Sequence, residues 1–319
     1  MPTLSWRPAT AAAIACVACA LAFPLAAKAG EAGVRSAALL DHGWWIDANV
    51  TYLTASGKEL KLDVYLPVNK RDKPMPVAMH FHGGGWVAGR REGAALSALP
   101  YMEMGFAFVN VSYRLANVAL APAAVEDALC ALQWVGRHAK KYNFDLSRVV
   151  TTGDSAGGHL ALATAMIPSD SPLTHQCAAN EFTWSGPYTN PAPKVAAVVN
   201  WYGITDVADM LQGPNVRSYA VAWFGSMPGR EGLARTVSPL THVRAGGPAV
   251  FTIHGDADPL VPYAHGVRLK AALDKAGVKN VLHTIKGGGH GGFTAEQYVG
   301  AYEAVHGFLR SLGIAPAQP

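Results

Sequence analysis

The sequence predicts a single α/β domain, in which a mostly parallel central sheet begins with an antiparallel N-terminal hairpin and carries helices on both faces. Two observations lead to this class. Short apolar runs rich in valine alternate along the chain with longer helical runs, and parallel strands joined by helices need cover on both faces of their sheet. The 319 residues are half apolar with 15% charged residues, which suits one large domain better than two small ones.

The elements follow in order along the chain. Two alternating runs, 48–54 and 59–66, are joined by Ala55-Ser56-Gly57-Lys58 and predict the hairpin. Strands are then expected at 77–81, 107–112, 148–152, 195–200, 249–254 and 281–285. Helices are expected at 93–104, 123–141, 156–166, 263–276 and 295–312.

Two stretches interrupt this alternation. Residues 168–193 are rich in Pro, Ser and Asn and follow a helix, so we expect a polar loop on the side of the sheet away from the functional site. Residues 203–247 follow the carboxyl end of a strand and contain Trp223 and Phe224. Because loops at the carboxyl ends of parallel strands border the site, this stretch is predicted to form a cap or substrate pocket.

The first 29 residues are typical of an export signal. An uncharged apolar run covers 11–27, and Ala27-Lys28-Ala29 has the small-x-small pattern of a signal-peptidase site. We predict cleavage after Ala29 and a mature domain of residues 30–319 that is secreted or periplasmic. An uncleaved membrane anchor is the alternative, although the run is short and is broken by Pro24.

The charge and the cysteine content bear on three questions: a nucleic-acid partner, a disulfide and a metal site. The formal net charge is +4 and no run of basic residues is present, which gives no electrostatic case for a nucleic-acid partner. Cys130 and Cys177 follow the signal, and an exported chain meets an oxidising compartment, but their spacing leaves pairing open. No cysteine or histidine cluster has the spacing of metal ligands, so neither a metal nor another cofactor is expected.

The strongest catalytic signal is Gly153-Asp154-Ser155-Ala156-Gly157-Gly158, which fits G-x-S-x-G. It follows the strand expected at 148–152 and precedes the helix expected at 156–166. A nucleophilic serine occupies such a strand-to-helix turn, and its flanking glycines allow close backbone packing. A Gly/Ser turn that only ends a strand is the alternative, but the context favours Ser155 as nucleophile.

A glycine tract upstream supports this interpretation. His82-Gly83-Gly84-Gly85-Trp86 follows the strand expected at 77–81. Consecutive glycines let backbone N–H groups turn toward one point, and two of them together with the N–H of Ala156 would form an oxyanion hole. A tract of this kind standing alone is more often a flexible linker, but here it precedes a nucleophile turn.

A serine nucleophile also needs a base. His290 lies in the glycine-rich loop 287–293 after the last predicted strand, and we predict that it is the base. His254, at the end of a strand, and His82 are its rivals. His159, one turn into the helix after Ser155, is expected to be a packed or capping residue.

The base in turn needs a carboxylate, and the segment 255–262 offers two. Asp258 stands farther from the strand end than Asp256 and precedes Pro259, which restricts its backbone. We therefore predict Asp258 as the acid, with Asp256 as the alternative, a turn residue that caps locally.

The order Ser155, Asp258, His290 on an alternating chain matches the α/β-hydrolases. The segments 82–86 and 153–158 resemble those of hormone-sensitive-lipase-like carboxylesterases. His159-Leu160-Ala161 and the segment 201–206 are similar to those of bacterial feruloyl and acetylxylan esterases. The resemblance covers roughly residues 50–312. It implies oxyanion donors at Gly84, Gly85 and Ala156.

We further expect aromatic residues from these motifs and from the 203–247 stretch to contact the substrate, namely Trp86, Tyr202 and Trp223. The predicted function is serine-dependent hydrolysis of carboxylic esters through an acyl-enzyme, with a short-acyl, small-molecule or polysaccharide-linked ester as substrate and no stable membrane partner. A peptidase or amidase is the alternative because the same triad serves both. A non-catalytic binding module is a further alternative, but such modules typically lose the serine or the histidine.

Overall fold

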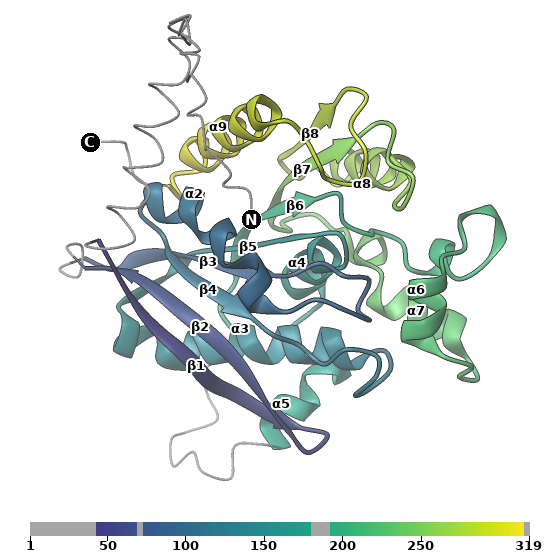
Figure 1. The fold of residues 1–319 in the computed structure, drawn as a ribbon, viewed down its shortest axis with the longest axis horizontal. Helices are drawn as coiled ribbons and strands as arrows, with labels where there is room; N and C mark the ends of the chain where they lie inside the picture. The colour runs from purple at the N-terminus through teal and green to yellow at the C-terminus, as the bar shows by residue number, and fades with distance from the viewer. Residues whose placement is uncertain (1–42, 69–72, 180–191, 316–319) are drawn as a thin grey trace, which may run out of the picture. The chain divides into compact units, whose positions relative to one another are not determined.

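The computed structural model describes residues 43–68, 73–179 and 192–315, and it confirms the predicted mostly parallel sheet. The strand order in this sheet is β1-β2-β4-β3-β5-β6-β7-β8. β1 and β2 form the predicted antiparallel hairpin, β2 pairs antiparallel with β4, and the remaining pairs are parallel (Figure 1). The strands are β1 Trp44–Ala55, β2 Lys58–Pro67, β3 Met75–Phe81, β4 Ala107–Val111, β5 Phe144–Asp154, β6 Val195–Trp201, β7 Ala249–Gly255 and β8 Asn280–Ile285. The predicted signal, residues 1–29, lies outside the described residues.

Helices cover both faces of the sheet. α2 and α9 contribute buried side chains to one hydrophobic cluster, and α3, α4 and α8 contribute to the other, as the layers in Figure 1 show. The α-helices of the described ranges are α2 Ala98–Glu103, α3 Ala123–Tyr142, α4 Ala156–Met166, α5 His175–Ala179, α6 Ser218–Phe224, α7 Arg230–Val237, α8 Ala264–Lys275 and α9 Ala295–Ser311.

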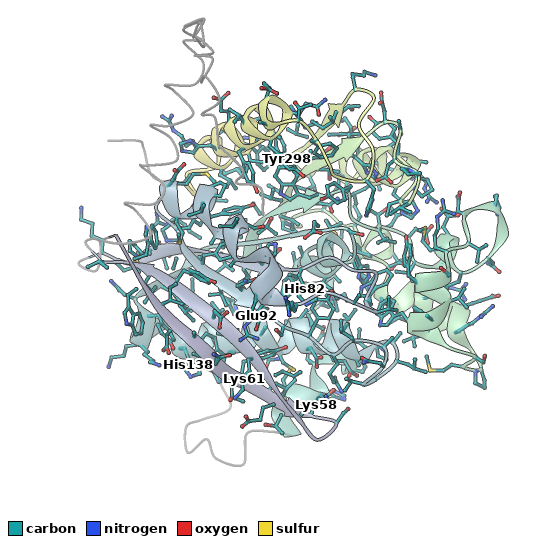
Figure 2. All side chains as sticks on the ribbon, viewed as in Figure 1. Lys58, Lys61, His82, Glu92, His138 and Tyr298 are labelled. Carbon is teal, nitrogen blue, oxygen red and sulfur yellow. A yellow bond between two sulfur atoms is a disulfide. The ribbon has the colours of Figure 1, made fainter. Side chains whose placement is uncertain are left out.

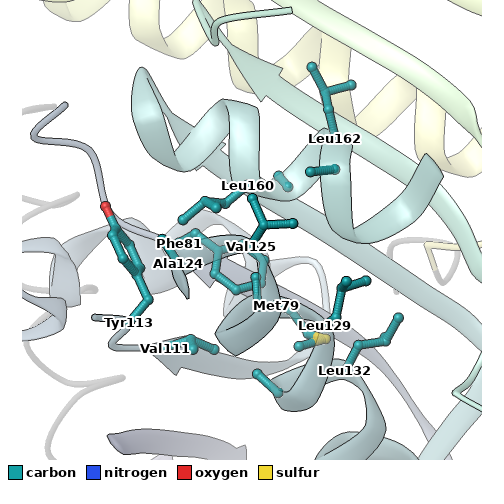
Figure 3. Packing of buried hydrophobic residues seen from close by; sticks show 14 of the residues in the cluster. Met79, Phe81, Val111, Tyr113, Ala124, Val125, Leu129, Leu132, Leu160 and Leu162 are labelled. Atoms are coloured by element: carbon teal, nitrogen blue, oxygen red, sulfur yellow. The ribbon is translucent and has the colours of Figure 1, made fainter. Parts of the chain in front are cut away.

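Apolar side chains from the sheet and from α3 and α4 pack together beneath the turn that joins β5 to α4. Figure 3 shows Met79 and Phe81 of β3 among Leu129 of α3 and Leu160 of α4, all members of one buried cluster. Full burial of a side chain of this size contributes about 1.5–3 kcal/mol. This packing fixes the ends of β3 and β5 and the start of α4 relative to one another.

The segment predicted as a helix at 93–104 differs from that prediction. A 3-10 helix, η1 Arg91–Ser97, leads into the short α2. Arg91 is buried, and its guanidinium donates to Asp63 of β2 (2.9 Å) and to Ser112 just after β4 (3.1 Å). This anchoring ties the first turn to the sheet, and such a tertiary contact is not visible in the helical periodicity of the segment.

The stretch 168–193, predicted as a loop, contains a 3-10 turn, η2 Pro172–Thr174, and the short α5; its residues 180–191 lie outside the described ranges. Cys177 of α5 forms a disulfide with Cys130 of α3, 47 residues earlier. The pairing that the sequence left open is therefore present, and it ties this stretch to a helix of the core.

Candidate active site

Ser155 occupies the sharp turn between β5 and α4. Its φ of 55° lies in the left-handed region, which is strained for a side chain other than glycine. The turn packs closely on the end of β3, because a Cβ added at Gly157 would lie 1.9 Å from the carbonyl oxygen of Phe81 and one at Gly153 would lie 2.4 Å from the same oxygen. The Ser155 N–H donates to the carbonyl of Trp201 (2.9 Å). The sequence-predicted nucleophile turn is thus held between two parallel strands.

His290, from the loop between β8 and α9, lies beside Ser155 at the edge of the sheet where the parallel strands have their carboxyl ends. Its Nε2 lies 2.8 Å from Ser155 Oγ, and its Nδ1 lies 2.8 Å from Asp258 Oδ2. Because a carboxylate only accepts, Nδ1 carries the hydrogen and Nε2 presents a lone pair to the serine hydroxyl. The structure therefore brings Ser155, His290 and Asp258 into one hydrogen-bonded series.

Asp258 is the carboxylate of this series, and Asp256 is not. The Asp258 side chain is fully buried, and its Oδ1 accepts from the N–H groups of Leu260 (2.8 Å) and Val261 (2.9 Å). Asp256 instead accepts from Lys286 Nζ (3.0 Å) and the N–H of Gly287 (2.6 Å). Its contacts steady the turn after β8 and do not reach His290.

Burial and hydrogen bonding shift the pKa of Asp258 in opposite directions. Burial raises the pKa of this carboxyl group, but hydrogen bonds from His254, His290 and the N–H of Val261 lower it by more, so the pKa lies well below its usual value. The lowered pKa favours the carboxylate form of Asp258, which accepts the hydrogen bond from the His290 imidazole.

The glycine loop after β3 turns sharply beside the nucleophile. Gly84 and Gly85 have φ values of 115° and 61°, and the Gly84 carbonyl accepts from the N–H groups of Val87 and Ala88. The His82 carbonyl accepts from the Tyr113 hydroxyl at 2.8 Å, and Figure 2 labels His82 at this loop. Within the described ranges, the N–H groups of Gly84, Gly85 and Ala156 have no protein acceptor, so all three are available to a bound oxyanion.

Two of the predicted substrate contacts are wrong. Trp86 and Trp223 are completely buried and stack on each other with ring centroids 4.1 Å apart. The Trp86 indole N–H donates to Nδ1 of His159 (3.2 Å), whose Nε2 faces the carbonyl of Val237 (2.8 Å). Large apolar rings gain most by burying each other, so these residues fasten the glycine loop to the 203–247 stretch and support the site from below. His159 is packed, as expected, and burial lowers its pKa to about 4.

Tyr202, the third predicted contact, does lie at the site. It follows β6 with a φ of 39°, and its ring meets the His290 ring edge-on with centroids 4.7 Å apart. Its hydroxyl oxygen would lie 2.9 Å from a Cβ added at Gly291. Tyr202 therefore supports the loop that delivers the base.

Tyr219 of α6 was missed by the sequence reasoning. Its Cβ would lie 2.8 Å from a Cβ added at Gly85, and its hydroxyl donates to the carbonyl of Leu260 at 3.2 Å. Burial raises its pKa, so the phenol remains a donor. The predicted cap stretch thus reaches the site through this tyrosine, which joins the glycine loop to the Asp258 loop. Its only signal in the sequence was its place in that stretch, four residues before Trp223.

A small cavity of about 110 Å³ lies beside Gly153 and Asp154 of the turn before Ser155. It is bordered by Asp154, by Tyr202 and by Tyr298 of α9, which Figure 2 labels. Its wall includes further side chains that can donate or accept hydrogen bonds, namely His80, Tyr101, Thr152 and Tyr302. This hollow is large enough for several water-sized groups.

The described ranges hold no group of three or more His, Cys, Asp or Glu side chains placed to bind a metal ion. A search of the same residues for a helix with the length and apolar character of a membrane span finds none.

Comparison with known proteins finds similarity to curated esterases. Esterase LipQ of Mycobacterium tuberculosis is 27% identical over 264 residues, which cover 79% of this chain and 59% of LipQ. The chain spans less than two-thirds of the length of the curated relatives that it matches first.

Two solved structures share the fold. A truncated form of a carbohydrate esterase from gut microbiota superposes with a TM-score of 0.69 at 29% identity, covering 84% of this chain and 96% of that one. Thermogutta terrifontis esterase 2, phosphonylated by cyclosarin, superposes with a TM-score of 0.69 at 26% identity, covering 85% and 97%. The fold is that of the α/β-hydrolases, as the sequence predicted. The BD-FAE family model matches residues 62–273, about two-thirds of the chain, and the chain belongs to this family.

Proposed function

We propose that this chain is a serine carboxylesterase that hydrolyses carboxylic esters through an acyl-enzyme. The observation that carries the proposal is the hydrogen-bonded series from Ser155 Oγ through His290 to Asp258, with both links at 2.8 Å. Membership of the BD-FAE family and likeness to an esterase that reacts with an organophosphate support it. Neither comparison favours a peptidase or a non-catalytic binding module.

The proposed reaction uses each group at a defined atom. Ser155 Oγ attacks the acyl carbon while its proton passes to Nε2 of His290, and Asp258 stabilises the resulting imidazolium. As the tetrahedral intermediate collapses, the ester C–O bond breaks and the same proton goes to the leaving alcohol. Water then repeats the sequence on the acyl-enzyme, giving up a proton to His290 and releasing the carboxylic acid and free Ser155.

The oxyanion donors are proposed to be the N–H groups of Gly84, Gly85 and Ala156. They are free of protein acceptors in the described ranges, and the N-terminus of α4 adds a favourable dipole. Removal of one such donor in hydrolases of this kind costs about 3 kcal/mol of transition-state stabilisation. Three convergent donors would therefore account for a large part of the rate enhancement.

Ser155→Ala tests the proposal directly. We expect kcat for p-nitrophenyl acetate to fall by about 10⁴-fold or more, with the far-ultraviolet circular dichroism unchanged, because the substitution removes only the attacking oxygen. An organophosphate should label the wild-type protein once, on the peptide that contains Ser155. Ser311→Ala, at the end of α9, serves as the control and should keep full activity. Loss of activity on labelling of a different serine would overturn the assignment.

The substrate is proposed to carry a short acyl group, on a small alcohol or on a plant-type polysaccharide. The family and the likeness to a carbohydrate esterase support the polysaccharide-linked class. A small acyl group is proposed because each further methylene gains about 0.8 kcal/mol only while it finds buried surface, and the cap stretch 203–247 that could supply such surface is short.

Measuring kcat/KM for p-nitrophenyl esters from C2 to C16 tests the acyl length. Activity is expected to peak between acetyl and butyryl and to fall beyond. Methyl ferulate and acetylated xylan, assayed beside this series, separate the aromatic from the sugar-linked class. A maximum at C10 or above would contradict the short-acyl proposal.

A further inference from the structure

A second imidazole faces the carboxylate of Asp258. His254, near the end of β7, is completely buried. Its Nε2 lies 3.3 Å from Asp258 Oδ2 and 3.0 Å from the carbonyl oxygen of Val261. Since both neighbours of Nε2 are acceptors, this nitrogen carries the hydrogen and shares it between them. The histidine that rivalled His290 in the sequence thus lies on the far side of the same carboxylate.

The contacts around Asp258 give this histidine a distinct position. Oδ1 is held by the backbone N–H groups of Leu260 and Val261. Oδ2 is held by His290 Nδ1 at 2.8 Å and faced by His254 Nε2 at 3.3 Å. His290 comes from a glycine-rich loop, whereas His254 belongs to a central strand. The strand therefore contributes a fixed donor to the oxygen that orients the base.

Packing alone does not explain an imidazole at this position. The second nitrogen of the ring, Nδ1, is buried without a hydrogen-bond partner among the described residues, which costs free energy that an apolar side chain of similar volume would avoid. Gly266 packs closely there, since a Cβ added to it would lie 3.2 Å from Nδ1. The polar character of the ring is used only at Nε2, toward Asp258 and Val261.

We propose that His254 is a positioning residue, which holds Asp258 Oδ2 in line with His290 and does not touch the substrate. The inference rests on the triad proposed above. In this arrangement His254 limits rotation of the carboxylate and helps to keep it ionised. Loss of the His254 N–H leaves His290 as the only side-chain donor to Oδ2 among the described residues, so the imidazole samples orientations in which Nε2 is turned from Ser155.

A double-mutant cycle between positions 254 and 258 tests the proposal. His254→Leu removes the N–H and keeps most of the volume, and we expect kcat for p-nitrophenyl acetate to fall about 10-fold with KM within about twofold. Asp258→Asn should lower kcat far more. In the Asp258→Asn background, His254→Leu should change kcat by less than about twofold, because its effect passes through that carboxylate. His254→Gln, which keeps an amide N–H, should recover most of the loss.

His265→Leu is the matched control. His265 is equally buried, but its Nδ1 contacts Thr205 and its Nε2 lies 3.3 Å from Asp209, and neither nitrogen contacts Asp258. It should lower the thermal midpoint and leave kcat within about twofold. An unchanged kcat in His254→Leu, or a full 10-fold loss that persists beside Asp258→Asn, would overturn the inference. If His254→Leu does not fold, His254→Ala replaces it in the cycle.

The same measurements separate this inference from the proposed triad. If Asp258→Asn retained wild-type kcat while Asp256→Asn lost it, the assignment of the acid itself would be wrong. If Asp258→Asn is inactive, Asp256→Asn is active and His254→Leu is unaffected, only the role of His254 fails.

Discussion

Gly153 and Gly157, one on each side of Ser155, are needed because neither carries a Cβ atom. Gly153 and Gly157 bring the nucleophile turn within van der Waals distance of the Phe81 carbonyl, where any Cβ would overlap it. The atom that a Cβ would meet is the backbone carbonyl oxygen of Phe81, which cannot move away as the end of a flexible side chain could. Accommodating a methyl group here requires the strand end and the helix start to separate, which would also move the serine.

Gly157→Ala is therefore expected to lower the free energy of unfolding by about 3 kcal/mol and to reduce kcat, since the turn is displaced. Gly232→Ala, on the exposed face of α7 with nothing within 4 Å of the added methyl group, is expected to raise stability by up to about 1 kcal/mol and to leave kcat unchanged. Urea unfolding of both variants checks the pair. Equal stability changes would show that the close approach to Phe81 is not limiting.

The residues of the hydrogen-bonded series could be predicted from the sequence, whereas the positions of the aromatic residues around it could not. Ser155 and His290 stand in glycine-rich motifs, and the backbone conformation of each motif is determined by residues that are close together in the sequence. Which aromatic residue faces the site depends instead on how α6 packs: the helix turns Trp223 into the core and Tyr219 toward Gly85. Tyr219 and Trp223 are four positions apart and therefore lie on the same face of α6, so the pattern along the helix does not tell which of the two reaches the site.

At the scale of elements, the secondary structure predicted from local sequence patterns differs from the structure where long-range contacts are present. The segment 93–104 is helical only in part: its first residues belong to the 3-10 helix η1, whose buried Arg91 binds Asp63 of β2. The polar composition of 168–193 likewise predicted a loop, whereas a disulfide secures α5 against α3. Sequence spacing cannot report the distance between two cysteines, so only the folded arrangement answers that question.

The disulfide between Cys130 and Cys177 closes a loop of 47 residues. On the chain-entropy model, removing it should lower the free energy of unfolding by about 4 kcal/mol. The bridge lies between α3 and α5 and shares no residue with the triad, so kcat of the Cys130→Ser/Cys177→Ser double variant should match the wild type under native conditions. Guanidinium unfolding measures the first quantity and steady-state kinetics the second. A loss of kcat in a fully folded double variant would show that the bridge reaches the site.

At the scale of the whole molecule, the chain order of the elements explains how far sequence reasoning could go. Strands alternate with helices, and parallel pairing puts their carboxyl ends at one edge, so the loops after β3, β5, β7 and β8 had to meet there. The convergence of Ser155, Asp258 and His290 could therefore be predicted, whereas the second imidazole on Asp258 could not. His254 lies within β7, and its contact depends on how the following turn folds back.

Export is the prediction that concerns the whole chain. We propose that the protein is secreted or periplasmic, and the disulfide is consistent with an oxidising compartment. Expressed with its own N-terminus in a bacterium that exports proteins, the mature chain should begin at Gly30. N-terminal sequencing of the purified protein checks this, and an intact Met1 or Pro2 would favour a retained anchor or a cytoplasmic enzyme.

The wide spacing of the triad along the chain has a consequence for how activity appears during folding. Ser155 and His290 are 135 residues apart, and they meet only after β5, β6, β7 and β8 have paired in turn. Pairings so remote in sequence are slow to form, since the intervening chain must be closed first. A nascent chain halted before residue 290 carries its nucleophile without its base. Regain of hydrolysis after dilution from denaturant would therefore trail the recovery of helical signal.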